Sequence, residues 1–139
     1  MRRGRCLCGA ISYEIDGEPV IVAHCHCTDC QRLSGAGHTT GAMFPADQVR
    51  VRGDASEFRL ESAAGSVVTR TFCPRCGSQL FGRNSRMAGH VTVAVGTLDD
   101  PDGVEPQVVV FARTRRSWDT VVGDLPTFDD QPGWTPDKG

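Results

Sequence analysis

Seven cysteines gathered in three short clusters constrain this chain more than any other feature of its sequence. The clusters span residues 6–8, 25–30 and 73–76. An odd number of cysteines cannot pair completely within one chain, and thiols in a reducing compartment are more often metal ligands or catalysts than disulfides. The sequence therefore predicts a fold organised around bound metal.

The middle cluster predicts a site with three thiolates. Extended backbone places alternate side chains on one face, so Cys25 and Cys27 can point at one ion. His24 and His26 then point away from it. A tight turn returns Cys30 to the same ion. Because zinc prefers four tetrahedral ligands, three protein thiolates leave one position for water or substrate.

The third cluster has a proline after its first cysteine and a glycine after its second, which is typical of a zinc knuckle. A knuckle supplies two ligands and needs two more. Spacing alone allows two arrangements. In one, Cys27 and Cys30 join the knuckle, and three cysteines have no role. In the other, the first cluster joins the knuckle in a closed four-thiolate site and the middle cluster forms an open one; only this arrangement uses all seven.

Length and composition favour one mainly β domain. A chain of 139 residues can bury a single core, and 16 Gly and 8 Pro predict many turns between short elements. The formal net charge of -2 gives no basic footprint for nucleic acid, and no apolar run resembles a signal peptide or a membrane span. We therefore expect a cytoplasmic protein without nucleic-acid or membrane partners, forming one domain over residues 1–139 with a C-terminal tail from about residue 124.

Hydrophobic patterns predict strands over residues 10–15, 20–24, 39–44, 48–52, 57–60, 66–72 and 90–95. The third to fifth of these are expected to form an antiparallel meander. The spacing predicts one helical turn over 29–33, with Thr28 as its N-cap. Residues 107–112 are the most apolar stretch and predict a central strand. The tail is expected to lie over the body of the domain through Phe128 and Trp134.

Four motifs carry a resemblance to a known family. They are Gly4-Arg5-Cys6-Leu7-Cys8-Gly9, His24-Cys25-His26-Cys27-Thr28-Asp29-Cys30, Phe72-Cys73-Pro74-Arg75-Cys76-Gly77-Ser78-Gln79-Leu80-Phe81 and Gly96-Thr97-Leu98-Asp99. In this order and at these separations they resemble the glutathione-dependent formaldehyde-activating enzyme (GFA) family, also called the CENP-V/GFA domain, over nearly the whole chain. Two segments near the C-terminus are similar to that family too, Trp118-Asp119 and Asp124-Leu125-Pro126-Thr127-Phe128.

The resemblance implies a mainly β, Mss4-like fold of several coiled antiparallel sheets with two zinc ions per chain. The implied ligands of a structural zinc are Cys6, Cys8, Cys73 and Cys76. The implied ligands of a second, catalytic zinc with an open coordination position are Cys25, Cys27 and Cys30. A thiol that loses its proton at the open position can attack an aldehyde carbon. The implied activity is a carbon-sulfur lyase acting on an adduct of glutathione, or another small thiol, with formaldehyde or a related aldehyde.

Two other interpretations stay open at this point. The second metal could be structural, with a histidine as its fourth ligand; the candidates are His24, His26, His38 and His90. The chain could also be a non-catalytic, zinc-stabilised binding module that carries a thiol or docks on a protein. Three arginines could anchor the carboxylates of glutathione or be ordinary surface charges: Arg32, Arg70 and Arg75. The sequence does not define the oligomeric state.

Overall fold

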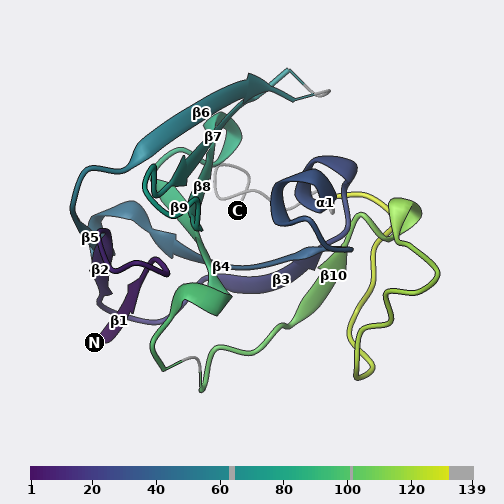
Figure 1. Cartoon of the computed structure of the whole chain (residues 1–139). Coiled ribbons are helices and arrows are strands. Elements are labelled where there is room, and N and C mark those ends of the chain that lie inside the picture. The colour runs from purple at the N-terminus through teal and green to yellow at the C-terminus, as the bar shows by residue number, and fades with distance from the viewer. Residues whose placement is uncertain (63–64, 101, 132–139) are drawn as a thin grey trace.

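The computed structural model describes residues 1–62, 65–100 and 102–131 and is mainly β, as the sequence predicts (Figure 1). The strands are β1 (Arg2–Arg5), β2 (Ser12–Ile15), β3 (Ile21–Cys25), β4 (Thr39–Pro45), β5 (Val49–Arg52), β6 (Ser56–Glu61), β7 (Val67–Phe72), β8 (Gln79–Asn84), β9 (His90–Ala94) and β10 (Val108–Val110). The α-helix is α1 (Thr28–Ser34), and short 3-10 helices are η1 (Ala46–Gln48), η2 (Ser85–Met87), η3 (Val95–Thr97) and η4 (Ala112–Thr114). None of the helices in these residues is long and apolar enough to cross a bilayer.

The larger sheet has seven strands in the order β10-β3-β4-β9-β8-β7-β6. Neighbouring strands are antiparallel except β10, which runs parallel to β3. The sheet bends between its two ends, and α1 lies within the bend (Figure 1). This arrangement brings the helix, the end of β3 and the start of β4 together.

The smaller sheet has the order β1-β2-β5 and packs against the larger one through β2. Tyr13 and Phe81 meet edge to face, with ring centroids 5.1 Å apart. Gly4 on β1 faces this contact, and a Cβ at that position would overlap the Tyr13 ring and lie 2.6 Å from the Thr97 carbonyl oxygen. The Tyr13 hydroxyl shares a 2.6 Å hydrogen bond with the Thr97 hydroxyl. Glycine is therefore required at position 4, where the motif of residues 4–9 meets the motif of residues 96–99.

The meander expected for residues 39–60 is wrong. Strand β5 leaves the neighbourhood of β4 and pairs with β2, whereas β6 pairs with β7. The patterns of Val49–Arg52 and Ser56–Glu61 define strands but not partners, because pairing depends on which apolar faces are buried against each other. Consecutive antiparallel pairing does occur, along β6-β7-β8-β9.

The expectation of a central strand at 107–112 is also wrong, because β10 is an edge strand of the larger sheet. The C-terminal tail covers its free side: the Val109 amide donates to Pro126 O and the Phe128 amide donates to Val109 O, both at 2.9 Å. Because the tail covers this edge, β10 can be as apolar as a central strand. Phe128 thus lies against the body as expected, and Trp134 lies outside the described residues.

Candidate metal centres

The first and third cysteine clusters come together in space. Cys6 and Cys8 follow β1, and Cys73 and Cys76 lie in the turn between β7 and β8. The Sγ atoms of Cys8 and Cys73 are 3.8 Å apart, although the residues are 65 positions apart in the chain, and those of Cys6 and Cys8 are 3.7 Å apart. Cys6 and Cys73 are buried, so this group lies at the boundary of the core.

The turn that carries Cys73 and Cys76 has the geometry of a knuckle. Gly77 adopts a φ of 79° and donates its amide to the Cys73 carbonyl at 2.8 Å, and the Cys73 amide donates to Ser78 O at 3.0 Å. The side chain and backbone of Ser78 both donate to Cys76, and these hydrogen bonds lower the pKa of the Cys76 thiol to about 5. The local backbone therefore favours a thiolate.

The spacing of these sulfurs fits a tetrahedral ion. Four thiolates at about 2.3 Å from a zinc ion are separated by about 3.8 Å from each other. A disulfide would need about 2.05 Å, and all seven cysteines are unpaired. The donor chemistry and the spacing both fit a zinc site that closes with four thiolates.

The middle cluster forms a second group, in which Cys25 ends β3, Cys27 caps α1 and Cys30 lies in the first turn of the helix. The N-cap is Cys27 rather than the expected Thr28: its Sγ accepts a hydrogen bond from the Cys30 amide at 3.3 Å. At the other end, Gly35 closes the helix with a φ of 69°. One short helix therefore delivers three sulfurs to one place.

The three thiols of this group influence one another strongly. Hydrogen bonds from Cys25 and Cys27 lower the pKa of Cys30. Hydrogen bonding to Cys27 and Cys30, together with burial, raises the pKa of Cys25. Like charges at this separation disfavour three thiolates without a compensating cation. A divalent ion would supply the positive charge that lets all three ionise.

Among the described residues, no fourth side chain of the His, Cys, Asp or Glu type joins this group. His24 hydrogen-bonds the Thr40 hydroxyl at 2.7 Å, and His26 lies 3.2 Å from Gly37 O. Alternation along β3 places both imidazoles on the face opposite Cys25, as the sequence predicts. Burial lowers the pKa of both histidines.

Of the three arginines suggested as carboxylate anchors, Arg70 lies at the group of three cysteines. It is half-buried on β7, and its Nη2 is 3.9 Å from Cys30 Sγ. Gly82 on β8 makes room for it, since a Cβ there would lie 2.6 Å from Arg70 Nη1. Arg32 and Arg75 are exposed.

Gln31, for which the sequence predicts no role, links the helix to the segment after β10. Its Nε2 donates to His26 O at 2.8 Å and to Thr114 O at 2.9 Å, and its Oε1 accepts from Arg116 Nε at 2.9 Å. Phe111, with a φ of 55°, turns the chain after β10 toward this contact. The segment then places Asp119 between two histidines, a contact that spacing along the chain could not indicate.

Comparisons with known proteins found a matching family model and a similar solved structure. The family model described as "Glutathione-dependent formaldehyde-activating enzyme" matches residues 1–114. A solved structure of a Rhodobacter sphaeroides protein is similar with a TM-score of 0.59 and 22% sequence identity, covering 90% of this chain and 98% of that one. At that identity the likeness concerns the fold alone. No curated protein matches the chain.

Proposed function

The chain belongs to the glutathione-dependent formaldehyde-activating enzyme family, and on that premise we propose that it is a zinc-dependent carbon-sulfur lyase. Its proposed substrate is an adduct of glutathione, or another small thiol, with formaldehyde or a related aldehyde. The observation that carries the proposal is the group of three thiols without a fourth side-chain donor among the described residues. A site of this kind leaves a position for a ligand from solution.

We assign one zinc ion to each cysteine group. Cys6, Cys8, Cys73 and Cys76 would hold a structural ion, because four thiolates complete a tetrahedral site and leave no position for substrate. Cys25, Cys27 and Cys30 would hold the second. When bound there, zinc supplies a soft Lewis acid that favours the thiolate form of a substrate thiol.

The protein's own groups favour an anionic thiol substrate at the second site. The Arg70 guanidinium lies beside Cys30 and offsets part of the negative charge of three thiolates. Its N–H groups can also donate charge-assisted hydrogen bonds to a carboxylate, and glutathione carries two carboxylates. Cleavage breaks the carbon-sulfur bond of the adduct, turns its carbinol into an aldehyde, and moves one proton from the hydroxyl oxygen to the sulfur.

Thiols that stay reduced are needed for both cysteine groups, and all seven cysteines are unpaired in the structure. This supports the cytoplasm as the proposed location.

The test is the exchange rate between free thiol and adduct, measured by NMR with 13C-formaldehyde and glutathione. The zinc-loaded protein is expected to accelerate exchange above the spontaneous rate, and Cys27→Ser should abolish the acceleration. Thr28→Ser, at the neighbouring exposed position of α1, is the matched control and should behave as wild type. Glutathione binding without acceleration would instead establish a thiol-binding module and refute the lyase.

A further inference from the structure

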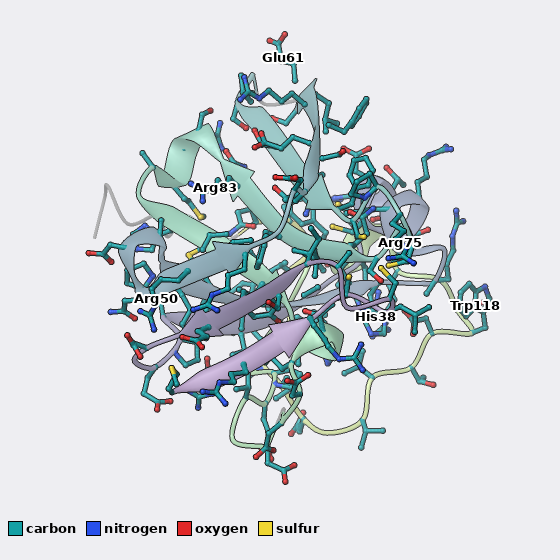
Figure 2. All side chains as sticks on the ribbon, turned by 60° about the vertical axis from the view of Figure 1, so that its left-hand side comes forward. His38, Arg50, Glu61, Arg75, Arg83 and Trp118 are labelled. Atoms are coloured by element: carbon teal, nitrogen blue, oxygen red, sulfur yellow. The ribbon has the colours of Figure 1, made fainter. Side chains whose placement is uncertain are left out.

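A second set of donor side chains lies on the opposite face of the larger sheet. His26 follows β3, His38 precedes β4, and Asp119 comes from the segment after β10. Because side chains alternate along strands, His26 and His38 face away from the group of three cysteines. In Figure 2, His38 lies beside the loop that carries Trp118, the neighbour of Asp119.

One carboxylate oxygen connects the two imidazoles. Asp119 Oδ2 is 2.7 Å from His38 Nδ1 and 3.3 Å from His26 Nδ1. The side chains of His26, Asp119 and His38 are 0%, 12% and 26% exposed, respectively. Three polar donors from two distant parts of the chain are thus held together largely out of contact with solvent.

The surrounding chain fixes this arrangement. Gly37 lies against Asp119, and a Cβ at Gly37 would overlap the carboxylate. Both Gln31 Nε2 and the Thr114 hydroxyl donate to the His26 carbonyl at 2.8 Å. These two hydrogen bonds fix the backbone at His26. The three donors therefore need little reorganisation to act together.

The His26 ring also has an unsatisfied atom. Its Nε2 is buried and has no hydrogen-bond partner among the described residues. Buried polar groups are nearly always paired, and exceptions are found at functional positions. Asp119 and the Gly37 carbonyl both face Nδ1 of this ring, so the unpaired Nε2 marks a free position on the imidazole without placing the ion.

We propose that His26, His38 and Asp119 form a third metal site, for a divalent first-row transition ion such as Zn²⁺. Two imidazoles and one carboxylate are the protein ligands of many zinc and iron sites that keep open positions. Ligands at about 2.1 Å from an ion are about 3 Å apart when they subtend a right angle, which is close to the two separations from Asp119 Oδ2. This site is independent of the proposed lyase activity.

One of the three donors, His38, also lines a pocket. His38 lines a cavity of about 500 Å³ together with His24, Glu105 and Leu125. Neither His26 nor Asp119 lines this pocket, so it borders the proposed site through His38 alone.

The experiment is 113Cd NMR and metal analysis of the untagged, metal-saturated full chain. Wild type is expected to give a resonance for cadmium bound by nitrogen and oxygen, distinct from the thiolate-bound resonances. His38→Ala and Asp119→Asn should lose that resonance and one ion per chain while keeping the others. His90→Ala, a histidine outside the group, is the matched control and should keep every resonance.

Gly37→Ala tests the arrangement without removing a donor. It should displace Asp119 and weaken binding at this site at least tenfold, while the thiolate resonances stay in place. A wild-type spectrum with thiolate-bound cadmium only would overturn the proposal directly, whether or not any variant folds. Equal metal content in wild type, His38→Ala and Asp119→Asn would do the same.

Discussion

Replacing Cys73 by Ser is expected to destabilise the whole domain. The Cys73 side chain is 0% exposed, and its sulfur lies 3.8 Å from that of Cys8. A serine hydroxyl does not replace a thiolate as a zinc ligand, so the variant should lose the zinc ion that we propose joins the two segments. Structural zinc binding contributes directly to the free energy of folding.

The minimum size of the effect follows from the loop that the ion closes. Cys8 and Cys73 are 65 positions apart, and a cross-link over that distance reduces the entropy of the unfolded chain by an amount worth about 4 kcal/mol. Domains of this size are stable by roughly 5–15 kcal/mol. At about 4 °C for each kcal/mol, the unfolding midpoint should fall by roughly 15 °C.

The assay is thermal unfolding, followed by circular dichroism, of zinc-loaded wild type, Cys73→Ser and Cys27→Ser. Cys27→Ser is the matched control, because Cys25 and Cys30 enclose a loop of only about five residues, worth about 2 kcal/mol. It should lose one zinc ion, and its unfolding midpoint should fall only about half as far as that of Cys73→Ser. A Cys73→Ser midpoint equal to that of wild type, or no lower than that of Cys27→Ser, would refute the assignment of Cys73 to a structural ion.

Three further predictions concern single side chains. Arg70→Ala should raise the KM for the thiol adduct about tenfold or more, because a hydrogen bond between charged groups is worth about 1.5–3 kcal/mol; Arg59→Ala on exposed β6 should leave KM unchanged in the same steady-state assay. Gly4→Ala should lower the free energy of unfolding in urea by about 1–3 kcal/mol or more, since its Cβ overlaps the Tyr13 ring, and an unchanged urea midpoint would contradict that packing. Burial raises the pKa of Tyr13 to about 12 in the folded chain, compared with about 10 for a free tyrosine. The free energy of unfolding, unaffected below pH ~10, should therefore fall by about 3 kcal/mol as the pH rises from about 10 to 12. Tyr13 is the single tyrosine of the chain, so tyrosinate absorbance reads this titration directly, and an ordinary midpoint near 10 in the folded protein would contradict the prediction.

Local patterns predicted most strand positions but not all their partners. Alternation located β2, β3, β7 and β9 within a few residues. It missed β1, because Arg2–Arg5 contains no apolar residue and becomes a strand by pairing with β2. It also placed β10 in the centre of the sheet, because an apolar edge strand covered by the tail has the same composition as a central one. Strand pairing depends on contacts between distant segments, which a local pattern does not contain.

Residues close together in the chain set the local geometry of the knuckle and of the middle cysteine cluster. The turn at Cys73–Gly77 and the extended run at Cys25–Cys27 are set by residues close together in the chain, so spacing could indicate which sulfurs share a side. Spacing alone allowed two arrangements of the cysteines. Placing Cys6 and Cys8 with the knuckle therefore required either the family resemblance or the structure.

The surroundings of these groups depend on contacts between distant parts of the folded chain. Arg70 reaches Cys30 because β7 and α1 meet across the bend of the larger sheet. Asp119 reaches His26 and His38 because the chain turns back after β10 and is held there by Gln31. Such contacts join residues about 40 to 90 positions apart, and they exist only once the folded core fixes the elements that carry them.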